Sequence, residues 1–108
     1  MHVPAPMYLP LPGRFDFGAY HAGDTPYLFE DAEAQPHFTP AQLRLSDTMT
    51  DYWAAFARTG SPNSTGLPAW RPYRPDSTPP HTQSLAPDRI IAVDYAHEHR
   101  LDFWSRLP

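Results

Sequence analysis

The clearest pattern of hydrophobic and polar positions runs from Thr39 to Gly60. Apolar side chains recur there at spacings of three and four, at Leu45, Met49, Tyr52, Trp53 and Phe56. Charged side chains fall on the opposite side, at Arg44, Asp47, Asp51 and Arg58. This period is that of one face of an α-helix, so residues 39–60 are predicted to form an amphipathic helix.

Local signals predict where this helix begins and ends. Thr39 is followed by Pro40 and Gln42, which gives a hydroxyl N-cap, a proline at the first helical position and a capping-box partner. Gly60 is suited to the position after the last turn, and Pro62 prevents the helix from resuming. We therefore expect the helix to end near Thr59.

The remaining segments carry weaker patterns. Pro4, Pro6, Pro10 and Pro12 recur too closely for a helix, so residues 1–17 are expected to be extended. Gly and Pro interrupt residues 61–87, which predicts a loop; its rings Trp70 and Tyr73 are expected to pin it against an apolar surface.

The C-terminal part is expected to contain one strand and one helix. The β-branched run that starts at Arg89 predicts a strand or an extended segment, so that residues 61–93 are a Pro-rich loop followed by this segment. Asp94 can cap a terminal helix over 94–107, on which Leu101, Trp104 and Leu107 form a narrow apolar stripe.

Composition limits what these elements can build. The chain has 108 residues, enough for one small domain, but its 15 prolines leave few continuous core-facing segments. A self-sufficient core is not expected, and the isolated chain is predicted to be loose or partly disordered. No apolar run approaches a membrane span, and the N-terminal residues lack the pattern of a signal peptide, so the compartment stays open.

Charge and cysteine content exclude several classes of function. The formal charge is −4, and the eight basic residues are scattered arginines, which disfavours nucleic-acid binding. With no cysteine there is neither a disulfide nor a thiolate metal site. His97 and His99 point to nearly opposite sides of a helix, and the flanking sequences of His2, His37 and His81 favour a surface position. No metal is therefore expected.

His21 stands apart because of its neighbours. It lies in the stretch GAYHAGDTPYLF, where small residues leave room for close approach to the ring. Spacing alone still favours an ordinary loop histidine. No Gly-x-Ser-x-Gly elbow and no nucleotide-binding loop occur in the chain, and Ser61 at the predicted helix end is interpreted as structural.

Three stretches, taken in order, change that interpretation: GAYHAGDTPYLF, LSDTMTDYWAAFARTGSPN and GLPAWRPY. Together they resemble the C-terminal part of the type B carboxylesterases, and the closing VDYAHEHRLDFW is similar to the terminal helix of that family. The resemblance covers residues from Gly18 onward. It implies an α/β fold class, with this chain as a piece of an α/β-hydrolase consisting of two helices, Pro-rich coil and little sheet.

The same resemblance implies roles for two residues. His21 in the 18–29 loop matches the triad histidine. Asp24 matches an acid that supports the site, and a buried or merely capping carboxylate is the alternative interpretation of this residue. The family needs no cofactor, and its substrate is a small carboxylic ester. Because α/β-hydrolases order their triad as Ser, acid and His, the other catalytic groups are expected upstream of Met1.

The expected partner is therefore a complementary N-terminal esterase segment, and the chain alone is expected to be inactive. Two alternatives remain open. One is a non-catalytic, proline-rich interaction module, and the other is a truncated relic with no independent activity.

Overall fold

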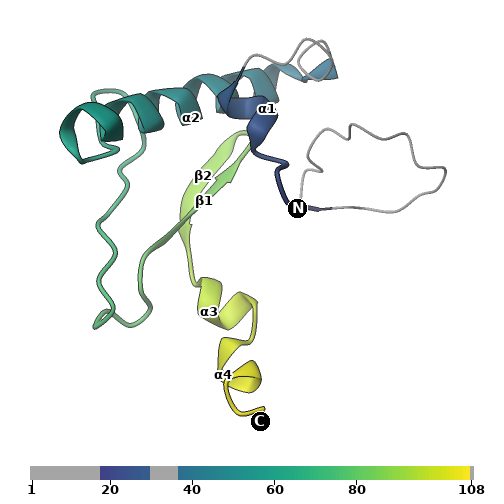
Figure 1. Cartoon of the computed structure of the whole chain (residues 1–108), viewed down its shortest axis with the longest axis vertical. Coiled ribbons are helices and arrows are strands. Elements are labelled where there is room, and N and C mark those ends of the chain that lie inside the picture. Colours follow the sequence, from purple (N-terminus) through teal and green to yellow (C-terminus); the bar gives the residue numbers. More distant parts are fainter. Residues whose placement is uncertain (1–17, 30–36, 108) are drawn as a thin grey trace, which may run out of the picture.

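The computed structural model describes residues 18–29 and 37–107, and the expectation of extended chain over 1–17 lies outside them. The described elements, in chain order, are α1 (Thr25–Leu28), α2 (Pro40–Thr59), β1 (Thr82–Ala86), β2 (Arg89–Val93), α3 (Tyr95–Glu98) and α4 (Leu101–Trp104). Figure 1 shows α1 against the long helix α2, with the β1–β2 hairpin extending from the same helix and α3 and α4 continuing away from it.

The two ends of α2 follow the local signals in the sequence. The Thr39 N–H donates to Gln42 Oε1 at 2.8 Å, and the Gln42 N–H donates to Thr39 Oγ1 at 3.3 Å, which completes the predicted capping box. At the other end Gly60 has a φ of 75°, and its N–H donates to the Phe56 carbonyl at 2.8 Å. The predicted helix is thus confirmed at both ends.

The hairpin corrects the expected loop. Residues 61–87 were predicted to be loop, but β1 occupies the last part of that range and pairs antiparallel with β2, with Thr82 opposite Val93. β1 contains few residues that favour strands, so its conformation depends on hydrogen bonding to β2 rather than on local preference. Arg44 Nη2 donates to Asp88 Oδ1 at 2.8 Å, and this contact joins the hairpin turn to α2.

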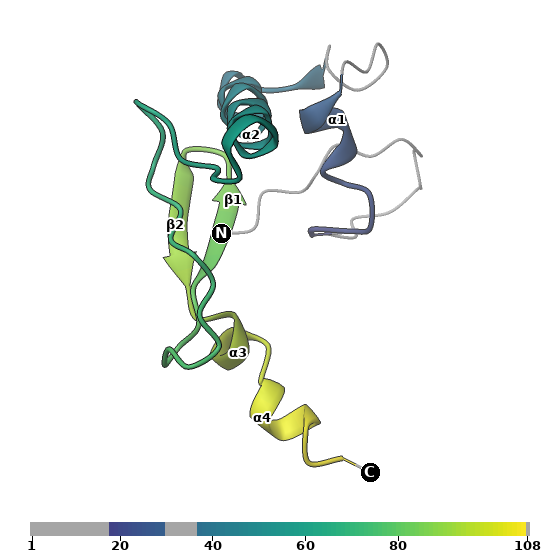
Figure 2. The same ribbon diagram turned by 60° about the vertical axis from the view of Figure 1, so that its left-hand side comes forward.

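The C-terminal segment also differs from the prediction. The prediction of a single helix over 94–107 is wrong. Instead, α3 and α4 are one-turn helices separated at Arg100, whose φ of 53° is left-handed. The predicted cap is present, since Asp94 Oδ1 accepts from the His97 N–H at 3.0 Å. The expected apolar stripe is exposed throughout, and Figure 2 shows α3 and α4 leading away from α2.

The core of the described part lies between α1, α2 and the hairpin. Its buried side chains are Tyr27, Phe38, Leu45 and Met49, and the partly buried Leu28, Leu85 and Ile90 pack against them. Trp53 and Phe56, predicted to share the covered face of α2, are 45% and 58% exposed. Tyr52 and Ala55 are buried as well, so the covered face of α2 extends into its C-terminal half, and Trp53 and Phe56 lie outside it.

Candidate active site

His21 lies in a tight turn that precedes α1. The Gly23 N–H donates to the Tyr20 carbonyl at 3.0 Å across this turn, and the His21 side chain between them is exposed. Ala22 has a φ of 63°, a left-handed conformation that costs a residue with a Cβ roughly 1–2 kcal/mol. The His21 side chain is therefore solvent-exposed on a constrained backbone.

Asp24, the second residue singled out, lies at the end of the same turn. It is the N-cap residue of α1, but its side chain makes no capping hydrogen bond, and the carboxylate is exposed. No hydrogen bond joins the His21 and Asp24 side chains within the part of the chain that the structure describes. Both groups are therefore close in sequence and accessible without being paired.

Tyr27 attaches this turn through three contacts, two with α2 and one with Phe38, which precedes that helix. Its ring packs on Phe38 with centroids 4.8 Å apart. Its hydroxyl accepts a hydrogen bond from Gln42 Nε2 at 3.1 Å, and its backbone carbonyl accepts one from Ser46 Oγ at 2.7 Å. Tyr27 follows His21 by only six residues, so these contacts lie close in sequence to the turn that carries the imidazole.

The environment of Tyr27 also changes its ionisation. Burial raises the pKa of the Tyr27 hydroxyl above its ordinary value, because the tyrosinate would lose its hydration. The hydrogen bond from Gln42 opposes this in part, since it stabilises the charged oxygen. Tyr20 in the turn also has a raised pKa, through burial first and then through its proximity to Tyr27. Both hydroxyls are protonated near neutral pH.

A second feature lies at the C-terminal end of α2. An open groove of about 560 Å³ is lined mainly by aromatic rings and prolines. We call it the aromatic groove; its rings are Tyr52, Trp53, Phe56, Trp70 and Tyr73. The Tyr52 hydroxyl donates to the Pro68 carbonyl at 2.6 Å, and this hydrogen bond holds the loop near the helix.

The contacts in the aromatic groove bear on the prediction that Trp70 and Tyr73 hold the loop against an apolar surface. Trp70 packs edge-on against Tyr52, with ring centroids 5.1 Å apart, and its centroid lies 6.3 Å from that of Trp53. The prediction for Trp70 is thus confirmed, with α2 as the surface it contacts. Tyr73 is 68% exposed and only borders the groove, so the prediction for this ring is wrong.

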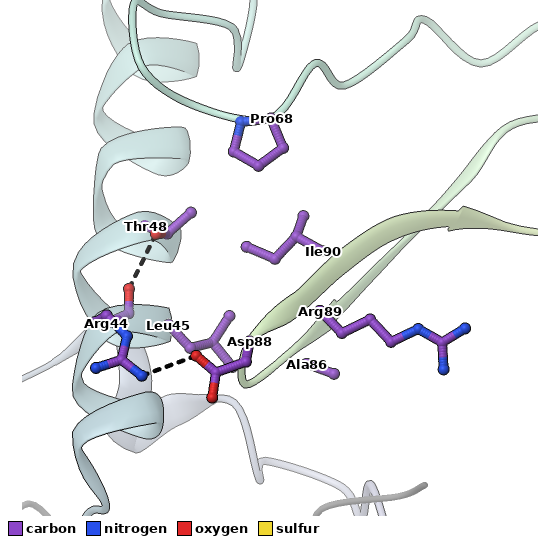
Figure 3. A pocket seen from close by; sticks show the side chains of 8 residues that line it. All are labelled: Arg44, Leu45, Thr48, Pro68, Ala86, Asp88, Arg89 and Ile90. Carbon is purple, nitrogen blue, oxygen red and sulfur yellow. Dashed lines mark hydrogen bonds and ion pairs between the residues drawn. The ribbon is translucent and has the colours of Figure 1, made fainter.

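Another open pocket, of about 360 Å³, separates α2 from the hairpin (Figure 3). Its walls mix apolar with polar and charged residues, and Leu45, Pro68 and Ile90 are among the side chains that face it. Arg44 and Asp88 pair at one side, while the Arg89 side chain points away from this pair. The charged groups do not converge on one point, so the pocket offers no defined polar anchor for a ligand.

The remaining histidines carry no comparable setting. His97 and His99 are exposed, and the His99 ring stacks on Tyr95 with centroids 4.1 Å apart. His81 pairs with the Gln83 side chain at 2.9 Å, and it is only partly exposed, whereas His37 is exposed. His2 lies outside the described residues. Over residues 18–29 and 37–107, no three His, Asp or Glu side chains gather closely enough to hold a metal ion.

The sequence pattern did not reveal the contact between Tyr27 and Gln42. Gln42 was interpreted only as a helix cap, yet it is buried and its amide bonds to two different segments. A polar residue among the apolar positions of an amphipathic helix is the one signal that could have indicated a buried hydrogen bond.

Comparison with known proteins identifies the family. The model of the carboxylesterase family matches residues 2–104. The chain is 40% identical over 91 residues to acylcarnitine hydrolase of Rattus norvegicus and 37% identical over 91 residues to cocaine esterase of Homo sapiens, covering 82% of this chain in each case. It is 33% identical over 90 residues to carboxylesterase 4A of Bos taurus, covering 83% of this chain.

These matches confirm the resemblance to the type B carboxylesterases, and the chain belongs to the carboxylesterase family. It spans 15% of the rat and human relatives and 16% of the bovine one. In the described residues, no helix has the length and apolar character needed to cross a membrane.

Proposed function

We propose that this chain supplies the histidine of a serine carboxylic-ester hydrolase, and that His21 is that residue. The observation that carries the proposal is the exposed His21 imidazole on a constrained turn in a chain of the carboxylesterase family. A base that must reach a serine and a bound ester needs an open ring on a fixed backbone. Among the histidines that the structure describes, His21 combines these properties.

The mechanism follows from the ordinary chemistry of such a triad. As a serine oxygen attacks the ester carbonyl, the His21 imidazole accepts the serine proton and becomes cationic. It then donates that proton to the departing alcohol, which leaves an acyl-enzyme. Water attacks the acyl group by the same route, and the carboxylic acid and free serine are regenerated.

Asp24 is proposed to support the imidazolium that forms in each half of this cycle. Its exposed carboxylate lies three residues after His21 and has no capping hydrogen bond to give up. A nearby negative charge favours the protonated form of a histidine. Asp24 would act on the charge of the ring rather than on the substrate.

The sequence contains no Gly-x-Ser-x-Gly elbow, so it offers no nucleophile of this type. We infer that the serine, the triad acid and the oxyanion donors come from the rest of an α/β-hydrolase domain. The elements of this chain would pack on its sheet. Without those groups the chain alone should not hydrolyse esters by this route, because oxyanion donors each contribute on the order of a hundredfold or more in rate.

Complementation tests this proposal. The chain is mixed with human cocaine esterase from which the matching segment has been deleted, and serine activation is followed with a fluorophosphonate probe. Labelling that requires both polypeptides would support the proposal. Association without labelling would leave binding as the role of the chain, and labelling of the truncated esterase alone would remove any catalytic contribution.

One observation favours a second candidate, a non-catalytic interaction module. The aromatic groove exposes Trp53, Phe56 and Tyr73 beside Pro62 and Pro72. Large exposed rings are typical of surfaces that bind other proteins. Fluorophosphonate labelling distinguishes the two candidates, because a binding module would associate with a partner without restoring a reactive serine.

A further inference from the structure

Gln42 occupies an unusual position for a polar residue, since it is only 7% exposed on a helix that packs its neighbours Leu45 and Met49 into the core. Its amide is satisfied on both sides. The oxygen Oε1 accepts from the Thr39 N–H at 2.8 Å, and Nε2 donates to the Tyr27 hydroxyl at 3.1 Å. One side chain therefore links the N-terminus of α2 to α1.

The capping bond fixes which way this amide faces. Because Oε1 is engaged by the Thr39 N–H, Nε2 must point toward Tyr27, so the tyrosine oxygen is the acceptor. The Ser46 hydroxyl adds a second contact one turn further along α2, by donating to the Tyr27 carbonyl at 2.7 Å. Tyr27 is thus held by its side chain and its backbone at once.

This attachment bears on His21 through a short and continuous path. The α1 helix starts four residues after His21, and the Thr25 N–H donates to the Ala22 carbonyl at 3.1 Å. The strained backbone at Ala22, with its φ of 63°, needs surrounding contacts to persist. Pro26 and Leu28 of α1 also pack inward, but within the described residues the side-chain hydrogen bonds between α1 and α2 both involve Tyr27.

We propose that Gln42 is a positioning residue for His21, acting through the Tyr27 hydroxyl. This inference rests on the proposed function, because it assigns the orientation of the imidazole in the working site to a buried amide on α2. Gln42 then has a second role besides the capping role predicted from sequence. Through Tyr27 it stabilises the turn that carries the catalytic base.

The first test uses the isotopically labelled chain bound to the truncated esterase, and it measures hydrogen exchange by NMR at the Gly23 and Thr25 amides. Tyr27→Phe and Gln42→Met are expected to speed exchange at these amides about fivefold, because each removes the hydrogen bond between the two side chains. Thr48→Val serves as the control, since it removes a helix side-chain hydrogen bond to the Arg44 carbonyl and has no contact with Tyr27.

Exchange at the two amides tests whether Gln42 stabilises the His21 turn through Tyr27. Unchanged exchange in both variants, or full exposure of these amides in the bound, unmutated chain, would overturn the inference. Gln42→Glu should restore most of the protection, because a carboxylate can keep the cap and accept a hydrogen bond from the Tyr27 hydroxyl. Equal loss in Gln42→Glu and Gln42→Met would also contradict it.

The second test uses the complemented enzyme. Tyr27→Phe and Gln42→Met should lower kcat about tenfold or more with little change in KM, since a misplaced base slows proton transfer without removing a substrate contact. If His21→Ala abolishes turnover while these two variants leave kcat unchanged, the positioning role fails and the proposed function stands. If His21→Ala retains turnover, the proposed function itself fails.

Discussion

The Asn63 side chain pairs with both backbone groups of Trp70. Asn63 Oδ1 accepts from the Trp70 N–H at 2.7 Å, and Asn63 Nδ2 donates to the Trp70 carbonyl at 2.8 Å. The carboxamide thereby imitates a paired strand and closes the loop between the two residues. It explains structurally why an asparagine follows the helix end in the stretch TGSPN.

Replacing Asn63 should release this loop. Asn63→Ala removes both hydrogen bonds, each worth about 1 kcal/mol when made, and allows Trp70 to leave Tyr52. We expect a red shift of tryptophan emission and loss of the near-ultraviolet signal of packed rings. Asn63→Asp keeps the acceptor for the Trp70 N–H and should give an intermediate change. An emission spectrum unaffected by Asn63→Ala would contradict the role assigned to this pair.

Gly60 provides a second prediction. A Cβ at this position would meet no atom within 4 Å, so only the φ of 75° opposes a larger residue. Gly60→Ala should therefore cost about 1 kcal/mol locally and speed amide exchange in the last turn of α2 about fivefold. Gly60→Asn should cost less, because asparagine tolerates this conformation. Equal exchange in the glycine and alanine forms would show that the cap does not limit the helix end.

High pH should loosen the contacts of α2. Burial raises the pKa values of Tyr27 and Tyr52 above the ordinary 10.0, so the folded form favours the protonated hydroxyls. This stabilisation is complete below pH 10 and is lost as the pH rises through the raised values. Helical ellipticity at 222 nm should then fall above pH 10. Tyr27→Phe or Tyr52→Phe should weaken that fall, whereas the exposed Tyr73→Phe should not.

The isolated chain should behave as a loosely packed molecule. Large apolar side chains are exposed along α2, the loop and α4, including Trp53, Phe56 and Trp104. Such surfaces promote self-association unless a partner covers them. Calorimetry should show no cooperative thermal transition, and the dye ANS should bind. A sharp transition at micromolar concentration would contradict this prediction.

The parts of the fold that depend on local chemistry were predictable from the sequence. The capping box at Thr39 and the glycine exit at Gly60 act within a few residues, so the pattern gave α2 its bounds. The break at Arg100 could not be foreseen, since no glycine or proline marks it. Strand β1 was missed because its pairing partner, β2, decides its conformation.

The same distinction applies to the candidate site. The small residues around His21 predicted an accessible ring, and the structure has this side chain exposed. The attachment of its turn through Tyr27 and Gln42 joins residues fifteen positions apart in sequence. Such a contact has no local signature beyond a polar residue at a buried helix position.

The most direct test of the account is ester turnover by the complemented enzyme with His21→Ala. The account predicts a loss on the order of a thousandfold or more in kcat, with association of the two polypeptides unchanged. His97→Ala, which alters an exposed histidine outside the turn, should leave turnover intact. Turnover by His21→Ala equal to that of the unmutated chain, at full association, would contradict the central claim.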